Sequence, residues 1–306
     1  MVKRGEFMSN ESFAHSVYYA PRGKNRLTVL GDHIAQTHLR ANDKLIGMIG
    51  EAGAGKSLII RGMFPGLMLT NDDEGINLRP LPLLNDYKND EYTIHSYHVD
   101  VRFETAFNQP WEIAKAVKAA VKSGKRVIVE HYDLISSYLD IFPELLIGIG
   151  EEVLVTRPGV FGPSSDEIKK IVFESIKYRK MAHTAEDLTA FAIENRGYCR
   201  PPLHRDVKSG FVLQFEKKPD FSIEKIEKEV QSMIEKNLEV KYIDEKHIKI
   251  GDYKYICTGP RIHLESTGSI KNFHLLSDFK IEPKTGFFLL AGLVGEERSQ
   301  FELSKL

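Results

Sequence analysis

The segment Gly50–Ser57 constrains the fold more than any other part of the chain. It reads GEAGAGKS and fits the pattern G-x-x-x-x-G-K-[ST], in which glycines let successive backbone N–H groups wrap a phosphate chain. An apolar run over Lys44–Gly50 precedes it, and apolar residues at helical spacing follow over Ser57–Leu67. A buried strand, a glycine-rich loop and a helix in this order predict a binding site for a nucleoside triphosphate.

The residues of this loop have distinct expected roles. Lys56 is expected to reach the β- and γ-phosphates, and Ser57 to coordinate Mg²⁺, so the expected cofactor is ATP or GTP with Mg²⁺. The alternative is a glycine-rich turn that carries Lys-Ser by chance and binds no nucleotide. The residues predicted to bind the phosphates are Gly50, Glu51, Ala52, Gly53, Ala54, Gly55, Lys56 and Ser57.

Three acidic residues are candidates for the chemistry that follows nucleotide binding. Glu130 ends the apolar strand RVIVE, Asp133 lies in the loop after it, and Asp100 ends the strand IHSYHVD. Ligands bind at the carboxyl edge of open α/β sheets, where all three would lie. Solvated strand-end acids are the alternative interpretation. The predicted catalytic set for hydrolysis or transfer of the γ-phosphate is Lys56, Glu130, Asp133 and Asp100.

The pattern of segments predicts two domains in the 306 residues. Strands alternate with helices, such as Trp111–Lys122, over 44–160, which predicts an α/β domain with a P-loop parallel sheet and flanking helices. The two prolines and two glycines of Pro158–Pro163 mark a boundary. An α+β domain follows over 164–306, with helices expected at Asp166–Lys177 and Ala182–Glu194. Residues 1–43 are expected to form an N-terminal arm or a short helix around Gly31–Leu39.

Composition limits the partners and the compartment. The formal net charge of -1 gives no overall attraction to nucleic acid, so any RNA would be held by a local basic patch. Only two cysteines occur, which excludes a disulfide framework and suits a reducing compartment. The chain contains neither an apolar run of membrane-spanning length nor a signal peptide at its start. We therefore expect a cytoplasmic protein with no membrane partner.

Segments of the second half resemble a known editing domain. Phe211–Val240 and Lys249–Leu276 are similar in order and spacing to the second additional domain of alanyl- and threonyl-tRNA synthetases, also found in free-standing alanyl-tRNA editing proteins. The family carries H-x-x-x-H on a helix, matched here by His183–Asp187, and then C-x-x-x-H before a T-G-x-I segment. The resemblance covers roughly residues 180–295. It implies an α+β editing-like domain and a zinc site in a pocket that hydrolyses mischarged aminoacyl-tRNA.

The chemistry of the matched residues suits zinc. His183 and Asp187 are four residues apart and share a helix face. Together with Cys257 and His263 they would offer two imidazoles, a carboxylate and a thiolate to a tetrahedral Zn²⁺. The sequence departs from the family at Asp187, where a second histidine is usual. Two extra residues also precede His263, so that Pro260 and Arg261 enter the loop; the alternative is a degenerate editing fold without metal.

Two hypotheses for function remain open. In the first, the chain is an enzyme, a P-loop NTPase or kinase joined to a deacylase-like domain. In the second, the editing-like domain binds tRNA or an amino-acid-like small molecule, and the nucleotide site acts as a switch. The chain holds no synthetase core, so we reject aminoacylation. The basic residues Lys169, Lys170, Lys177, Arg179 and Lys180 are interpreted preferably as a solvated helix face, with contact to the phosphates of an RNA acceptor stem as the alternative. His204 and Arg205 are interpreted preferably as part of a surface loop, with contact to a substrate as the alternative.

Overall fold

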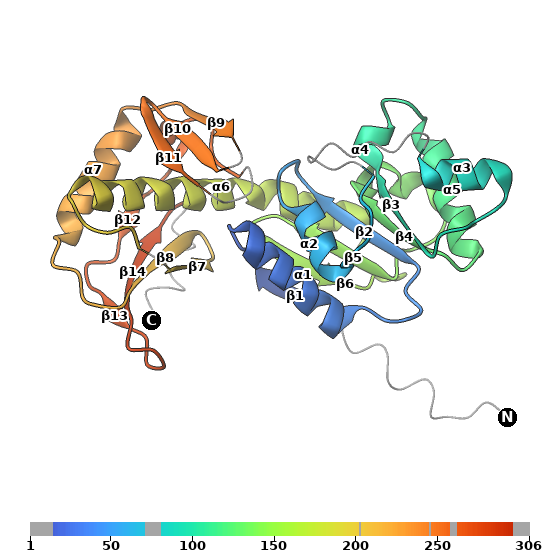
Figure 1. Cartoon of the computed structure of the whole chain (residues 1–306), viewed down its shortest axis with the longest axis horizontal. Helices are drawn as coiled ribbons and strands as arrows, with labels where there is room; N and C mark the ends of the chain where they lie inside the picture. The colour runs from blue at the N-terminus through green and yellow to red at the C-terminus, as the bar shows by residue number, and fades with distance from the viewer. Residues whose placement is uncertain (1–14, 71–80, 202, 245, 258–261, 296–306) are drawn as a thin grey trace. The chain divides into compact units, whose positions relative to one another are not determined.

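The computed structural model describes residues 15–70, 81–201, 203–244, 246–257 and 262–295. The chain divides into two compact units, each with its own helices and sheets (Figure 1). Unit 1 comprises Met1–Tyr18 and Leu27–Glu174, and unit 2 comprises Tyr19–Arg26 and Ser175–Leu306. The fold is mixed α/β, with one mixed six-stranded sheet and further antiparallel sheets.

The six-stranded sheet has the order β1-β6-β5-β2-β4-β3. Strand β2 lies between β4 and β5 and is parallel to both, and β3 is parallel to β4. Strand β6 is antiparallel to β5, so the prediction of a parallel sheet is wrong there. Only two residues separate the strands, and so short a link permits only a hairpin. The strands are β1 (His15–Tyr19), β2 (Leu45–Gly50), β3 (Ser96–Asp100), β4 (Arg126–Glu130), β5 (Leu145–Ile149) and β6 (Glu152–Thr156).

Helices α1 and α2 cross at two glycines. A Cβ atom on Gly62 would lie 2.0 Å from the carbonyl oxygen of Thr28, and one on Gly31 would lie 2.2 Å from that of Ile59. The backbones of the two helices are therefore in direct contact. The helical segments of this half are α1 (Lys24–His38), α2 (Lys56–Met63), α3 (Pro82–Asn89), α4 (Val101–Glu104), α5 (Pro110–Lys122) and the 3₁₀ turns η1 (Tyr132–Leu134) and η2 (Ser136–Tyr138).

The N-terminal region contains more regular structure than the expected arm. Strand β1 and helix α1 occupy much of 15–38, whereas residues 1–14 lie outside the described part of the chain. The buried positions of α1 are Leu27, Gly31, Ile34 and His38. Only two of these four are strongly apolar, which explains why the hydrophobic periodicity is weak.

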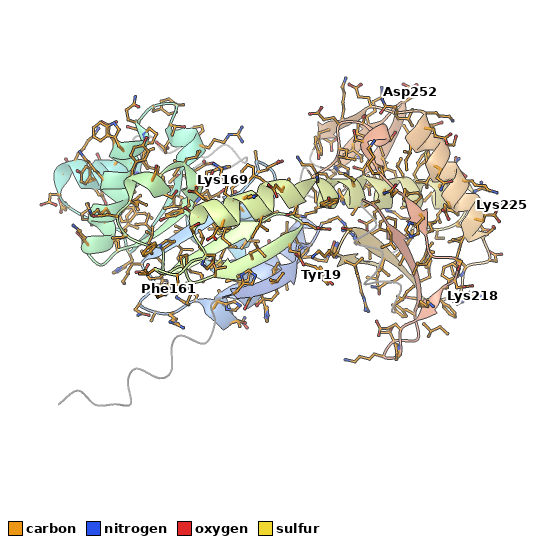
Figure 2. All side chains as sticks on the ribbon, turned by 180° about the vertical axis from the view of Figure 1, so that it is seen from behind. Tyr19, Phe161, Lys169, Lys218, Lys225 and Asp252 are labelled. Atoms are coloured by element: carbon orange, nitrogen blue, oxygen red, sulfur yellow. The ribbon has the colours of Figure 1, made fainter. Side chains whose placement is uncertain are left out.

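A single helix, α6 (Ser165–Asn195), replaces the two helices expected there. The polar stretch that interrupts its apolar pattern contains Arg179, which is only 1% exposed. The boundary between the units lies inside this helix, between Glu174 and Ser175, and thus differs from the Pro158–Pro163 segment. That segment lacks regular structure, and its Phe161 is fully exposed (Figure 2).

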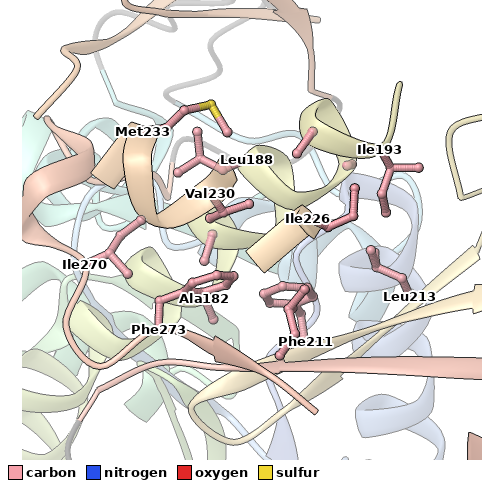
Figure 3. Packing of buried hydrophobic residues seen from close by; sticks show 14 of the residues in the cluster. Ala182, Leu188, Ile193, Phe211, Leu213, Ile226, Val230, Met233, Ile270 and Phe273 are labelled. Atoms are coloured by element: carbon pink, nitrogen blue, oxygen red, sulfur yellow. The ribbon is translucent and has the colours of Figure 1, made fainter. Parts of the chain in front are cut away.

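Unit 2 packs α6 and α7 against antiparallel strands (Figure 3). Phe211 on β8 is completely buried, and Val230 of α7 and Ala182 of α6 belong to the same core. The main sheet has the order β12-β14-β8-β7 with β13 beside β14, and β9, β10 and β11 form a second sheet. The elements are β7 (Leu203–Val207), β8 (Gly210–Phe215), α7 (Ile223–Glu235), β9 (Val240–Asp244), β10 (His247–Ile250), β11 (Tyr253–Ile256), η3 (Thr267–Ser269), β12 (His274–Leu275), β13 (Lys280–Ile281) and β14 (Phe288–Leu293).

Candidate functional site

The Gly50–Ser57 loop joins the central strand β2 to α2. Gly53 and Gly55 have φ angles of 77° and 101°, in the left-handed region where glycine is favoured. A Cβ atom at Gly55 would also lie 2.6 Å from Leu27 Cδ1. The loop therefore requires glycine at these two positions, both for its backbone and for its packing.

Lys56 is the first residue of α2 and is 4% exposed. Its ammonium group donates to the carbonyl oxygens of Gly50 (3.2 Å) and Glu51 (2.9 Å). Burial lowers the pKa of Lys56, and the charges of Glu130, Asp100 and Asp133 partly offset this effect. The fold thus brings the lysine and all three sequence-predicted acids into one electrostatic environment.

A chain of hydrogen bonds fixes the carboxyl group of Glu130. His98 Nε2 lies 3.1 Å from Glu130 Oε1, and the backbone N–H of Thr70 donates to His98 Nδ1 at 3.1 Å. Because Nδ1 accepts this hydrogen bond, the ring hydrogen is on Nε2, which donates to Glu130. Burial opposes the ionisation of Glu130, yet its bonds with His98 and Ser57 and the nearby Lys56 charge hold its pKa below the ordinary value.

The other two acids make different contacts. The carboxyl group of Asp100 accepts from the backbone N–H of Phe103 and caps α4. Asp133 is nearly buried and pairs with Lys169 Nζ at 3.0 Å. Glu130 is therefore the acid that contacts Ser57, whereas Asp100 and Asp133 act on Lys56 through their charge.

Two histidines beside Glu130 were missed from the sequence. His98 and His131 are 2% and 7% exposed, and burial lowers the pKa of His131, with the charge of Lys56 adding to the effect. His131 also has a φ of 56°, which is uncommon outside glycine. The signal in the sequence is the position of each ring: His98 lies between Tyr97 and Val99 inside β3, and His131 directly follows the buried run of β4.

The four predicted metal ligands meet inside unit 2. One ligand atom from each of His183, Asp187, Cys257 and His263 lies within 4.8 Å of the others, and all four residues are buried. His183 Nε2 is 3.2 Å from Cys257 Sγ, which is 3.6 Å from His263 Nε2. His263 Nε2 is 2.9 Å from Asp187 Oδ2. Ligand atoms about 2.0–2.3 Å from a tetrahedral zinc lie on the order of 3–4 Å apart, and the three contacts of 2.9, 3.2 and 3.6 Å are close to this spacing.

The protonation states in this group suit a divalent cation. Burial, with the charge of His263 adding to it, lowers the pKa of His183 to about 4. Burial opposes the ionisation of Asp187, but the two histidines hold its pKa below the ordinary value. The Tyr242 hydroxyl lies 2.9 Å from His263 Nδ1 and orients the ring. A neutral His183 and an ionised Asp187 are therefore available near neutral pH.

Other residues singled out in the sequence lie in different settings. Arg179 is buried, and its guanidinium donates to the carbonyl oxygen of Pro21, so it is not part of a solvated basic face. His204 and Arg205 are exposed, as expected, but they belong to strand β7 and not to a loop. Pro260 and Arg261 lie outside the described residues. No described helix is long and apolar enough to cross a membrane.

Comparisons with known proteins add little to this geometry. No protein-family model matches the chain, and no curated protein matches it. Among solved structures, the ornithine aminotransferase from Toxoplasma gondii ME49 is similar over 83% of this chain and 69% of that chain. The sequence identity is 10% and the TM-score is 0.22, which is too low to carry an argument about fold or function.

Proposed function

We propose that the chain binds ATP or GTP with Mg²⁺ at the Gly50–Ser57 loop and hydrolyses or transfers the γ-phosphate, as P-loop NTPases and kinases do. The observation that carries this proposal is the position of Lys56. It begins a helix directly after a loop with two left-handed glycines, and it lies in the field of Glu130. Backbone N–H groups and a lysine at a helix N-terminus form a site for phosphate oxygens.

The residues around the loop have complementary roles in this proposal. Phosphate oxygens would take the place of the carbonyl oxygens that Lys56 now contacts, and they would bring formal negative charge into direct contact with the buried ammonium group. Ser57 and Glu130, which already contact each other, hold Mg²⁺ directly or through water. The ion would neutralise charge on the β- and γ-phosphates.

Calorimetric titration of the full chain with ATP and GTP tests the nucleotide site. Lys56→Ala should reduce the affinity for the preferred nucleotide by at least about tenfold, because it removes the charge that meets the β- and γ-phosphates. Lys122→Ala, at an exposed lysine of α5 in the same unit, is the matched control and should bind like the wild type. Equal affinity in Lys56→Ala, or no binding of either nucleotide by the wild type, would overturn the proposal.

For unit 2 we propose a zinc site and an editing-like fold related to the second additional domain of alanyl- and threonyl-tRNA synthetases. The resemblance of Phe211–Val240 and Lys249–Leu276 supports the fold, and the spacing of the four buried donors supports the ion. Elemental analysis should find about one zinc per chain. Cys257→Ala should lose it, whereas Cys199→Ser, at the other and exposed cysteine, should keep it. A wild-type protein purified without zinc that also fails to bind added zinc would contradict this site.

Turnover of mischarged tRNA is expected to be weak. Asp187 brings an anion to a position where the family has a neutral imidazole, which reduces the net charge of a metal centre and its power to polarise an ester. Alanine-specific tRNA charged with serine or glycine is the direct substrate for this test. Turnover comparable to that of a genuine editing enzyme would show that the substitution is harmless. If turnover is weak or absent, the alternative is that unit 2 binds an amino-acid-like ligand and that the nucleotide site acts as the switch.

A further inference from the structure

A groove runs along α7 in unit 2. The end of α6 and the turn between β10 and β11 form its other walls, and none of the four metal-ligand candidates lines it. Its volume is about 690 Å³. Clefts that bind ligands have volumes of roughly 300–1,000 Å³, so this groove is large enough for a ligand of several residues. Neither the nucleotide loop nor the proposed zinc site accounts for it.

Part of the groove wall is apolar. Tyr253 is 54% exposed, and its ring centroid lies 4.8 Å from that of Phe191. Met233 and Leu238 also line the groove. A tyrosine ring that packs on one side and is open on the other offers a contact surface for a further ring, and aromatic pairs contribute to binding beyond the area that they bury. The groove can therefore hold an aromatic side chain.

Two lysines of α7 in the groove lining are open to a ligand. Within the described part of the chain, the ammonium groups of Lys225 and Lys236 make neither a hydrogen bond nor a salt bridge, whereas Lys228 pairs with Glu224. Lys225 lies in the first turn of α7, and Lys236 is the C-terminal cap. At a rise of 1.5 Å per residue, they are about 16 Å apart along the helix axis. The groove thus offers two separated positive charges.

The two acids of the groove already have partners. Glu229 lies on α7 between the two lysines, and its oxygens accept hydrogen bonds from Asn195 at 3.2 Å and from Arg196 at 2.8 Å. Asp252, in the turn between β10 and β11, lies 3.6 Å from Lys249 Nζ. Neither acid therefore neutralises the two open lysines, but the charge of Glu229 remains in the middle of the groove.

This order of charges selects the kind of anion. A strand of RNA would place a phosphate at each step and so bring one against Glu229, and like charges in contact oppose binding. A peptide with carboxylates only near its two ends avoids this repulsion. An extended peptide spans about 3.3 Å per residue, so about five residues reach from one lysine to the other. The charges therefore favour an acidic peptide over RNA.

We propose that the groove along α7 binds a short extended peptide segment of a partner protein. Carboxylates near the two ends of the segment pair with Lys225 and Lys236, and an aromatic side chain between them packs on Tyr253. Exposed ion pairs contribute little each and are screened by salt, so the binding is weak and depends on ionic strength. The site works without the nucleotide loop and without zinc.

Calorimetric titration of the full chain with three blocked pentapeptides tests the proposal. Glu-Ala-Phe-Ala-Glu carries both carboxylates and the ring, Lys-Ala-Phe-Ala-Lys reverses the charges, and Glu-Ala-Ala-Ala-Glu lacks the ring. The first peptide should bind about tenfold more tightly than either of the others, and its affinity should fall as the NaCl concentration rises. No binding of the first peptide, or equal affinity for it and either of the others, would overturn the proposal.

Variants assign the binding to the groove. Lys225→Glu should weaken binding of Glu-Ala-Phe-Ala-Glu about tenfold, because a carboxylate then meets a carboxylate. The change keeps α7 intact, since an acid at this position completes a capping box with Ser222. Lys218→Glu, at an exposed lysine outside the groove (Figure 2), is the matched control and should bind like the wild type.

Two results with these variants would overturn the proposal. The first is an unchanged affinity for Glu-Ala-Phe-Ala-Glu in folded Lys225→Glu. The second concerns a five-nucleotide uridine RNA. If this RNA binds the wild type more tightly than the peptide does and loses affinity in Lys225→Glu, the groove is a site for RNA.

Discussion

The acid stability of metal-free unit 2 should depend on His183. Burial lowers the pKa of this residue from 6.5 to about 4 in the folded chain. In the unfolded chain the imidazole takes up a proton at a higher pH than in the folded chain. The free energy of unfolding therefore falls as the pH drops from about 6.5 toward about 4.

The size of this effect follows from the two pKa values. The protonation linkage predicts that the free energy of unfolding falls by nearly zero at about pH 7.5, by about 1 kcal/mol at about pH 5.5, and by about 3 kcal/mol at about pH 4.5. The carboxyl groups of Glu186 and Asp187 also have lowered pKa values, but in the unfolded chain they titrate below this window. His183 is thus the principal source of the effect in this cluster between about pH 6.5 and 4.5.

Urea denaturation of the chelator-treated protein measures the effect. Trp111 is the only tryptophan and lies in unit 1, so its fluorescence follows that unit. Circular dichroism follows the unfolding of both units. A transition that is seen by circular dichroism but not by fluorescence therefore belongs to unit 2. His183→Gln removes the titrating group, and its unit 2 transition should depend less on pH than that of the wild type. The reasoning is refuted if both proteins lose the same stability between about pH 6.5 and 4.5.

Two further substitutions test unit 1. Gly62→Ala should lower the free energy of unfolding by about 3 kcal/mol, because the new Cβ would meet the Thr28 carbonyl oxygen. Gly159→Ala is the control, since a Cβ atom there would have nothing within 4 Å. Equal urea midpoints for the two variants, measured by Trp111 fluorescence, would contradict the packing of α1 against α2. His98→Phe should reduce Mg²⁺-dependent nucleotide turnover about 10- to 100-fold with little change in nucleotide affinity, because Glu130 loses its donor. The exposed His95→Phe should match the wild type, and turnover unaffected by His98→Phe would exclude this positioning role.

The sequence predicts best where the signal is local. Pro110 and Gln109 form the N-terminal cap of α5, and its apolar period matches the buried face, so this helix was found nearly to its bounds. The Gly50–Ser57 loop was found because its glycines are required by the backbone itself. The spacing His183–Asp187 reveals two donors on one helix face without any knowledge of the remaining fold.

Features that depend on distant residues could not be predicted in this way. The antiparallel β6 follows from a link of two residues, but the sequence pattern predicts no strand at Leu145–Ile149 and therefore no hairpin. The continuity of α6 depends on burial of Arg179, a residue that a hydrophobic pattern treats as exposed. His98 and Glu186 gain their importance from Thr70 and Arg22, which lie far away in sequence.

Buried carboxylates in both units are paired with arginines. In unit 1, Asp43 is 1% exposed, and its two oxygens accept hydrogen bonds from Arg157 and from the backbone N–H of Arg40. In unit 2, Glu186 is 4% exposed, its Oε2 accepts a hydrogen bond from Arg22 Nε at 2.9 Å, and His204 Nδ1 lies 3.6 Å from its Oε1. Removing one partner of a buried ion pair leaves an uncompensated charge, so each arginine is needed for the stability of its unit.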